Sequence, residues 1–256
     1  MKIYYVHYVQ FLELASITIE TNAKIKTIIP KIGTENCASK WSSIIRKSIC
    51  VRLRKGKTFV RFNASRRLFN EDPLVASQGI HSLIKWKEFD IFKTTFDLVI
   101  YWMLIQETKP QVIIELGSGS GGSAIWLADI ASALGVETHV YSFDLFKPEI
   151  SHDRVTFVEY DLTKINGQTL PPYWENFIGT KLIIEDAHVN LDSILTAFDN
   201  ILEKGDYLIV EDSQDKHGII EDFINGNDDK YKLDQFYLDF FGTNMTCSSN
   251  SVFKVF

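Results

Sequence analysis

Residues 111–129 constrain the fold of this chain more than any other stretch. The segment begins with the apolar, β-branched run 112–114, which is typical of a buried parallel strand. Four glycines follow within six residues, at Gly117, Gly119, Gly121 and Gly122, and residues 123–134 then have the apolar spacing of a helix. Glycines allow a tight turn and a close approach of a ligand to the backbone, and a helix N-terminus offers N–H groups to an anion. The pattern predicts the strand–turn–helix unit that opens a nucleotide-binding α/β domain.

The same stretch limits which nucleotide the turn would bind. Gly117, Gly119 and Gly122 have the G-x-G-x-x-G spacing of dinucleotide-binding proteins, so a nicotinamide dinucleotide (NAD) stays open as a ligand. Glu115 lies two residues before the first glycine, where a carboxylate would repel a pyrophosphate but would suit the ammonium group of an amino acid. With Ser123 at the start of the helix, the stretch resembles motif I of S-adenosylmethionine (SAM) dependent methyltransferases. The resemblance favours SAM over NAD, and it implies as cofactor-binding residues Glu115, Gly117, Ser118, Gly119, Gly121 and Ser123.

The rest of the chain alternates strands and helices as a doubly wound sheet does. Five parallel strands are predicted, followed by a closing antiparallel pair; the seven segments are 111–116, 138–144, 154–161, 181–186, 206–212, 232–241 and 251–256. A helix over residues 97–106 is expected to pack against the sheet. The predicted fold is therefore α/β, with a doubly wound, mostly parallel Rossmann-like sheet and an antiparallel C-terminal strand pair.

Each predicted parallel strand carries an acidic residue at or next to its C-terminal end, which is the edge where open parallel sheets bind ligands. Asp144 ends the second strand and is expected to accept hydrogen bonds from the two ribose hydroxyls of a cofactor. Asp161 ends the third and could accept from the adenine amino group. The alternative for both is a helix N-cap or a solvated loop acid.

Three further acids, Asp186, Glu211 and Asp212, end the fourth and fifth strands. Carboxylates brought together at neighbouring strand ends repel one another unless a cation lies between them. Oxygen ligands alone favour a hard ion such as Mg²⁺, which could bind a substrate hydroxyl and make it more acidic. The sequence thus predicts a Mg²⁺ site at these three residues. The alternative is that Asp212 caps a helix and Asp186 begins a turn.

The chain as a whole resembles the cephalosporin-hydroxylase-like (cephamycin-type) family of SAM-dependent methyltransferases. The resemblance lies in residues 85–89, 112–129, 205–212 and 240–250. It covers roughly residues 75–256 and implies SAM-dependent methylation with a Mg²⁺ site similar in logic to that of catechol O-methyltransferase. The family's acidic pair matches Glu211 and Asp212, whereas its first metal acid usually precedes a histidine directly. Here the local sequence is Glu-Asp-Ala-His over residues 185–188, and Asp186 is the best match.

The residue that removes the substrate proton is the least determined part of the predicted site. Catechol-type enzymes carry a lysine base three residues after the first metal acid, and here that position is Val189, which cannot take a proton. His188 is therefore the predicted catalytic base, because imidazole accepts a proton near neutral pH. His217 is the second candidate, and a structural or solvated role is the alternative for each.

Charge separates the chain into two parts. Residues 1–70 carry 14 Lys and Arg against three Glu, whereas the remaining 186 residues carry 13 Lys and Arg against 30 Asp and Glu. The domains expected are a basic N-terminal extension, residues 1–75, with a β-hairpin over residues 50–62, and a methyltransferase domain, residues 76–256. The basic extension could bind nucleic acid, but it lacks a nucleic-acid-binding motif. Docking on the acidic domain of its own or a neighbouring subunit is favoured, so a homo-oligomer is expected.

Composition limits the compartment and the class of protein. The apolar start of the chain is interrupted by His7, Gln10 and Glu13 and has no small-residue cleavage site, so a signal peptide is not expected. No apolar run approaches the ~18 residues of a membrane span. Three scattered cysteines predict neither a disulfide framework nor a zinc site and suit a reducing cytoplasm.

The function predicted from these features is Mg²⁺-assisted O-methylation of a hydroxyl on a small molecule by SAM. A secondary metabolite or a sugar is the acceptor that the family resemblance implies. N- or C-methylation on the same fold is the first alternative. An NAD-dependent oxidoreductase and a non-catalytic SAM-binding protein are the others.

Overall fold

The structure is a computed structural model of the 256-residue chain. It describes residues 17–21, 24–28, 50–52, 58–60, 73–79, 82–167 and 171–256. The chain divides into two compact units, Met1–Asn70 and Glu71–Phe256, each described here by itself.

Two antiparallel strand pairs are described in the first unit. Strand β1 (Ile17–Thr21) pairs with β2 (Lys24–Ile28), and β3 (Cys50–Arg52) pairs with β4 (Thr58–Val60). The second pair lies within the segment for which the sequence predicts a hairpin. The turn of that hairpin and most of the basic extension lie outside the described residues, so the role of the extension stays a prediction.

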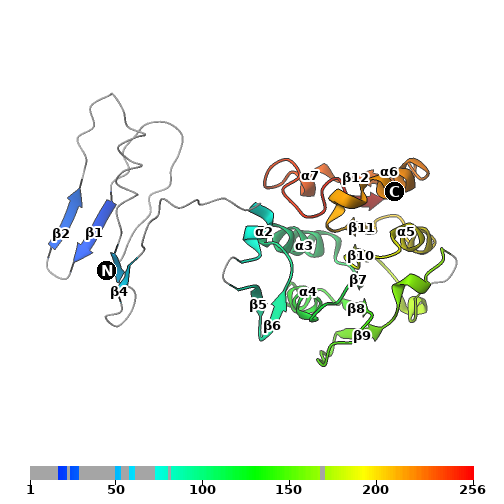
Figure 1. The fold of residues 1–256 in the computed structure, drawn as a ribbon, viewed down its shortest axis with the longest axis horizontal. Helices are drawn as coiled ribbons and strands as arrows, with labels where there is room; N and C mark the ends of the chain where they lie inside the picture. The colour runs from blue at the N-terminus through cyan, green and yellow to red at the C-terminus, as the bar shows by residue number, and fades with distance from the viewer. Residues whose placement is uncertain are drawn as a thin grey trace. The chain divides into compact units, whose positions relative to one another are not determined.

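The second unit is built on a seven-stranded sheet (Figure 1), whose order is β12–β13–β11–β10–β7–β8–β9. Strands β9, β8, β7, β10 and β11 are parallel to one another, and β13 and β12 are antiparallel to their neighbours. The strands are β7 (Val112–Leu116), β8 (His139–Asp144), β9 (Val155–Glu159), β10 (Lys181–Glu185), β11 (Tyr207–Val210), β12 (Tyr231–Leu233) and β13 (Val252–Val255). The predicted fold class is confirmed.

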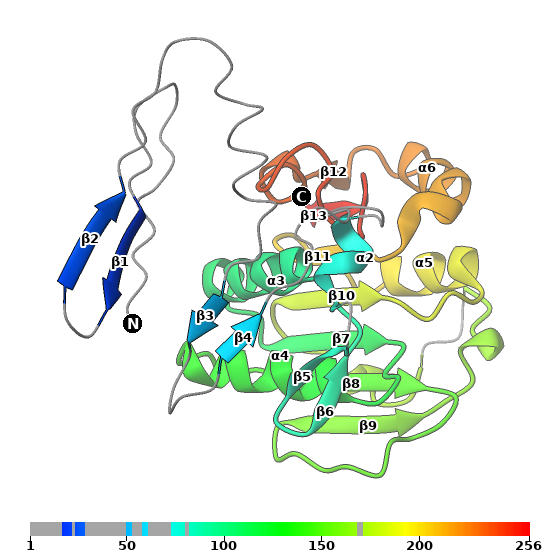
Figure 2. The same cartoon turned by 60° about the vertical axis from the view of Figure 1, so that its left-hand side comes forward.

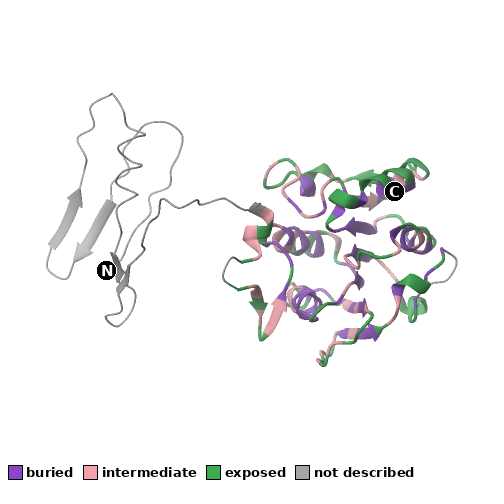
Figure 3. Ribbon diagram, viewed as in Figure 1, coloured by how far each residue is buried: buried purple, intermediate pink, exposed green. Residues whose placement is uncertain are grey.

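Helices cover both faces of this sheet, which explains why its central strands are apolar throughout. All residues of β7 and of β10 are buried. Alternate residues face opposite sides: Ile113 packs with α3 (Thr95–Thr108) and α4 (Gly122–Ala133), and Ile114 packs with α5 (Leu191–Asp199) and α6 (His217–Asn225). Figure 1 shows these two helix layers on either side of the strands, and Figure 3 shows the buried residues gathered along the sheet and the inner helix faces. Each aliphatic side chain buried in this way contributes about 1.5–3 kcal/mol.

A β-hairpin brings the segment before α3 onto the start of α4. Strands β5 (Ile84–Trp86) and β6 (Phe89–Ile91) form the hairpin (Figure 2). A side chain at Gly122 would place its Cβ 2.2 Å from the carbonyl oxygen of Asp90, so only glycine permits this approach. Ser120 Oγ also donates to that carbonyl, at 2.8 Å. The hairpin thereby carries the residues that follow β6 over the C-terminal edge of the sheet.

The closing antiparallel pair differs from the prediction in its first strand. The predicted antiparallel pair is confirmed, but the length of its first strand, residues 232–241, is wrong. The strand β12 ends at Leu233, and residues 235–238 form the short helix α7 (Gln235–Leu238). Asp234 caps this helix by accepting a hydrogen bond from the backbone N–H of Phe236, a local bond that competes with the strand ladder. The remaining short elements are α2 (Pro73–Ser77) and the 3₁₀ helices η1 (Leu162–Lys164), η2 (Trp174–Asn176) and η3 (Ser213–Lys216).

Candidate active site

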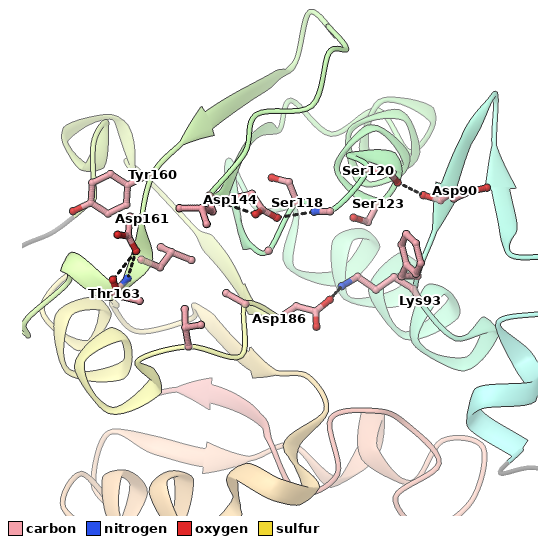
Figure 4. Close-up of a pocket in the computed structure, with 17 residues that line it drawn as sticks. Asp90, Lys93, Ser118, Ser120, Ser123, Asp144, Tyr160, Asp161, Thr163 and Asp186 are labelled. Atoms are coloured by element: carbon pink, nitrogen blue, oxygen red, sulfur yellow. Dashed lines mark hydrogen bonds and ion pairs between the residues drawn. The ribbon is translucent and has the colours of Figure 1, made fainter.

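A cavity of about 310 Å³ opens at the C-terminal edge of the parallel strands (Figure 4). Backbone of the glycine turn lines one part of it, and acidic side chains from three strand ends line others. The lining residues are Asp90, Phe92, Lys93, Gly117, Ser118, Gly119, Ser120, Ser123, Asp144, Leu145, Tyr160, Asp161, Leu162, Thr163, Asp186, Ala187 and Val189. Most cofactor residues predicted from the sequence are among them; Glu115 and Gly121 are not.

The glycine turn can take its shape only with glycine at two of its positions, Gly117 and Gly121. Gly117 has a φ of +105°, and a Cβ on it would lie 2.7 Å from the carbonyl oxygen of Asp186. Gly121 has a φ of +81° and directly precedes α4, and its N–H donates to the Ser118 carbonyl at 2.7 Å. The turn therefore lets a ligand approach bare backbone at the start of a 12-residue helix, as the sequence predicts.

Asp144 stabilises the same turn from the end of β8. One of its carboxylate oxygens accepts a hydrogen bond from the N–H of Gly119 at 2.8 Å, and the other accepts from the N–H of Leu145 at 2.7 Å. Each oxygen retains a further acceptor position, because a carboxylate offers about four in all. Asp144 can thus order the turn and still accept from hydroxyl groups in the cavity.

Glu115 is fully buried and reaches the cavity only through other side chains. Its Oε2 accepts from Ser142 Oγ at 2.6 Å, and Ser142 in turn lies 2.6 Å from the hydroxyl of Ser118, which lines the cavity. Its Oε1 has no hydrogen-bond partner among the described residues. Burial raises the pKa of Glu115, although Lys93 acts against this. Glu115 does not line the cavity, so the predicted direct contact with a ligand ammonium group would require that group to pass between the lining residues to Glu115 Oε1.

Asp161 is a helix N-cap, the alternative role that the sequence leaves open for it. Its carboxylate accepts from both the N–H and the hydroxyl of Thr163, at 3.1 and 2.6 Å, and so caps η1. The Thr163 side chain and then its backbone hold the pKa of Asp161 below the usual range. Asp161 nevertheless lines the cavity, so the cap and a ligand contact are compatible.

Lys93 is the residue of this site that sequence reasoning missed. Its side chain is 3% exposed, and its ammonium group donates to Asp186 at 2.6 Å and to Glu211 at 2.8 Å. Burial lowers the pKa of Lys93, but the carboxylates of Glu211 and Asp186 outweigh it and raise that pKa well above its usual value. Lys93 is therefore a fixed cation rather than a base. Its only signal in the sequence is a lysine two residues after the end of β6.

Glu211 faces inward and not toward the open edge. One of its oxygens accepts from Lys93, and the other accepts from the hydroxyl of Tyr101 on α3, both of them buried. Burial raises the pKa of Glu211 despite the nearby ammonium group. Of the three acids predicted to hold a metal, Asp186 thus shares the Lys93 ammonium group with Glu211 on its buried side and lies near Asp212 on its open side.

His188 completes a different group of three. Its Nε2 lies 3.2 Å from Asp186 Oδ1 and 3.4 Å from Asp212 Oδ2. One ligand atom from each of these residues lies within 4.8 Å of the other two, on a part of the edge where the side chains of His188 and Asp212 are half exposed. The hydrogen bond with Asp186 raises the pKa of His188. His217, the second candidate base, has its Nε2 3.1 Å from the Ser249 carbonyl and does not line the cavity.

A second buried lysine holds the backbone of this group. Lys216 Nζ donates to Glu185 Oε2 and to the Glu211 carbonyl, both at 2.8 Å. The other oxygen of Glu185 accepts from the N–H groups of Ala187 and His188 at 3.1 and 3.2 Å. One ammonium group therefore links the ends of β10 and β11, which carry the two halves of the group.

Part of the chain is similar in sequence to known methyltransferases. The family model described as Rhamnosyl O-methyltransferase/CmcI matches residues 78–172. The Rhamnosyl O-methyltransferase of Mycobacterium leprae (strain TN) is 26% identical over 136 residues, which is 50% of this chain and 59% of that protein. That of Mycobacterium tuberculosis (strain ATCC 25618 / H37Rv) is 27% identical over 145 residues, 53% of this chain and 59% of that protein. The chain thus spans under two thirds of the length of these relatives.

Solved structures of CmcI have the same fold. Its Mg-SAM form aligns with a TM-score of 0.58 at 23% identity, and its SAH form with a TM-score of 0.54 at 22% identity. The alignments cover 68% of this chain in both cases, and 76% and 82% of the CmcI chains. Residues 78–172, which include the glycine turn and Asp144, are therefore similar to the Rhamnosyl O-methyltransferase/CmcI family, and the resemblance predicted from the sequence is confirmed.

Proposed function

We propose that this chain is a SAM-dependent O-methyltransferase that acts on a hydroxyl group of a small molecule. The observation that carries the proposal is the cavity itself, in which a bare glycine turn and the carboxylate of Asp144 lie on one edge with Asp186. The named activity of the relatives and the Mg-SAM form of CmcI agree with this arrangement. In the described residues, no helix is long and apolar enough to cross a membrane.

The cofactor would be held by the glycine turn and the acids beside it. Gly117 and Gly119 offer bare backbone, and Asp144 can accept from hydroxyl groups. The tyrosine and leucine that flank Asp161 add apolar surface. Bound SAM supplies a methyl group on a positively charged sulfur. The chain's own part is to align an acceptor oxygen with that methyl group and to exclude water.

The residues present also fit a divalent cation. Asp186 and Asp212 offer carboxylate oxygens and His188 offers a nitrogen, and this donor set leaves positions open toward solvent. A cation bound there would make an acceptor hydroxyl more acidic. The role of base, predicted for His188, and the role of ligand exclude each other at Nε2, because one lone pair cannot hold both a proton and a metal.

The acceptor that we propose is a sugar or a related polyhydroxylated metabolite. The relatives are named for a rhamnosyl acceptor, but this chain covers only 59% of them. A cytoplasmic location and a homo-oligomeric state remain part of the proposal. They follow from the cysteine content and from the opposite charges of the two parts of the chain.

Calorimetric titration tests the cofactor directly. SAM and its demethylated product SAH should both bind the full chain, whereas NAD should not. Methyl transfer from labelled SAM should then be measured on a panel of rhamnosides, other glycosides and phenols. Binding of NAD in place of SAM would contradict the proposal, and transfer to amines alone would favour N-methylation.

A further inference from the structure

Two loops that line the cavity follow strands that are not neighbours in the sheet. Residues 160–163 follow β9 and residues 186–189 follow β10, and both segments contribute to the lining. The strand order places β7 and β8 between β9 and β10. Figure 4 shows Tyr160, Asp161 and Thr163 grouped at one end of the cavity. The hydrogen bonds of the sheet therefore do not join these two walls of the cavity directly.

The side chain of Asn190 joins the two walls. Its amide nitrogen donates to the backbone carbonyls of Leu162, Thr163 and Ile165, at 3.1, 3.4 and 2.6 Å. These carbonyls belong to η1 and its C-cap, and the last carbonyls of a helix have no partners within the helix. Asn190 thus caps η1 from a position 25 to 28 residues further along the chain.

The link depends on the amide group of this asparagine. All three partners are acceptors, so an N–H group must face them, and an aspartate would present a carboxylate instead. Asn190 directly precedes α5, where an asparagine side chain usually accepts a hydrogen bond from the first turn of the helix, but here it makes no such bond. Its φ of +50° is a left-handed conformation that asparagine tolerates. The amide therefore serves the link to η1 and not the helix.

Apolar side chains hold the same two segments together below the link. Leu162 and Ile165 near η1 and Leu191 and Ile194 on α5 are buried in one apolar cluster. Leu162 also lines the cavity, and Leu191 directly follows Asn190, so the amide lies where this cluster meets the cavity. Loss of the amide should therefore free the cavity end of η1 without removing the core beneath it.

We propose that Asn190 is a positioning residue of the cofactor site, which holds residues 160–163 at the distance from residues 186–189 that cofactor binding requires. This inference rests on the proposed function, which places the cofactor between the glycine turn and the residues around Asp161. A wall that is not held takes the binding arrangement for only a fraction of the time, and the apparent affinity falls by that fraction. Asn190 itself does not line the cavity, so it acts on the cofactor only through this wall.

Calorimetric titration of the full chain with SAH tests the inference. Asn190→Gly should weaken SAH binding by about tenfold, as expected for a wall that is in place about a tenth of the time. Glycine accepts the left-handed backbone of this position, so the variant should fold. Asn200→Gly is the matched control, because Asn200 follows the other end of α5 and donates to the Gly167 carbonyl at 3.5 Å, away from the cavity lining. It should leave the SAH affinity unchanged.

A second variant separates positioning from the stability of α5. Asn190→Asp has no N–H group for the three carbonyls, but an acid at the start of a helix is favourable for that helix. Asn190→Asp should therefore lose at least as much SAH affinity as Asn190→Gly, although α5 is not weakened. Urea unfolding of both variants supplies the folded fraction for which the affinities are corrected.

Hydrogen exchange followed by mass spectrometry locates the effect. The N–H groups of Lys164 and Ile165 donate to the carbonyls of Asp161 and Leu162 within η1. Without SAH they should exchange faster in Asn190→Gly than in the unaltered protein, and saturating SAH should slow them again.

Two results would overturn the inference. One is unchanged SAH affinity in folded Asn190→Gly, and the other is an equal loss of affinity in Asn200→Gly. An unaltered protein that binds no SAH would contradict the proposed function, and hydrogen exchange at η1 would then decide alone whether Asn190 holds this wall.

Discussion

The two ends of strand β10 both bury lysine and carboxylate groups, yet they serve different purposes. At the start of the strand, Lys181 pairs with Asp206 at 3.0 Å, and both side chains are 2% exposed. Asp206 also accepts from two backbone N–H groups, those of Lys181 and Glu203. Neither Lys181 nor Asp206 lines the cavity, so this pair fixes the entry to the strand and nothing else.

At the other end of β10, acids outnumber lysines and the site is open. Two lysines, Lys93 and Lys216, are accompanied by five carboxylates, those of Glu115, Glu185, Asp186, Glu211 and Asp212. Closely spaced acids in excess of their counter-ions repel one another and favour binding of a further cation. A further carboxylate near Lys181, that of Glu203, is 78% exposed, so the buried charges at the start of the strand balance. The buried charges at the open edge do not, and an acidic excess there favours a bound cation.

Removing the buried lysine at each end gives the largest effect and tests this contrast most directly. Lys93→Met and Lys181→Met should each lower the free energy of unfolding by about 3–5 kcal/mol, because each leaves a buried carboxylate without its partner. Only Lys93→Met should abolish methyl transfer per folded molecule. Urea unfolding and an assay corrected for the folded fraction measure the two quantities. Equal loss of specific activity in both variants would remove the distinction between the two ends.

Variants of Lys216 test whether this lysine supports the proposed metal site by positioning its residues. Lys216→Met should weaken metal binding by about 10–100-fold, the usual cost of losing a group that orients the ligands. Lys216→Arg should restore much of it, since it retains the charge and can still donate to Glu185. Metal titration of both variants, with thermal melting as the fold check, measures the effect. Unchanged metal affinity in a folded Lys216→Met variant would show that the loop at residues 186–188 needs no such support.

The proposed cofactor site on the same edge is ordered by backbone donors, whereas the acids of the proposed metal site are held by lysines. Variants of the cofactor site should therefore have smaller effects. Asp144→Ala should weaken SAM binding by roughly 1.5 kcal/mol, because it removes acceptors for the ribose and loosens the turn at Gly119. Asp161→Ala should have a smaller effect, since Thr163 already uses that carboxylate. Calorimetry with SAH measures both. If Asp144→Ala keeps full affinity, the cofactor lies elsewhere in the cavity.

Local patterns in the sequence predicted the scaffold and residues most of which line the cavity, because both depend on neighbouring residues. The apolar run before Gly117, the glycines, and the acid at the end of each strand are each contained in a short segment. Lys93 could not be placed in the same way. It meets Asp186 and Glu211 across 93 and 118 residues of chain, and no periodicity encodes such a pairing.

Backbone conformation explains where the structure differs from the roles that the sequence predicts for particular residues. Glu211 and Asp212 are adjacent, so the sequence groups them, but their side chains leave the chain in different directions and only one remains at the open edge. Asp212 has a φ of +45°, a left-handed conformation that a residue pattern does not reveal. The first strand of the closing pair was predicted too long, because the carboxylate of Asp234 caps a helix and so ends the strand after Leu233.

A third ion pair, more exposed than those at the ends of β10, should give the smallest effect. Asp129 on α4 accepts from Trp86 Nε1 at 2.6 Å and pairs with Lys87 at 2.7 Å, which ties the β5–β6 hairpin to the helix. Burial raises the pKa of Asp129, but the bonds from Lys87, Trp86 and His152 outweigh it and lower that pKa below its usual value. A carboxyl group whose pKa is lowered by folding stabilises the protein above its unfolded pKa of about 3.9, and this contribution is lost as the pH falls through the folded pKa.

Asp129→Asn should therefore reduce the free energy of unfolding by less than about 1 kcal/mol at pH 7, since Lys87 is half exposed and its pair with Asp129 is screened by solvent. Urea unfolding of both proteins at pH 7 and in acid measures the difference, which should shrink in acid. A loss in the free energy of unfolding as large as that of Lys181→Met would mean that solvent exposure does not determine how much an ion pair stabilises this protein. The contrast between the ends of β10 would then need another cause.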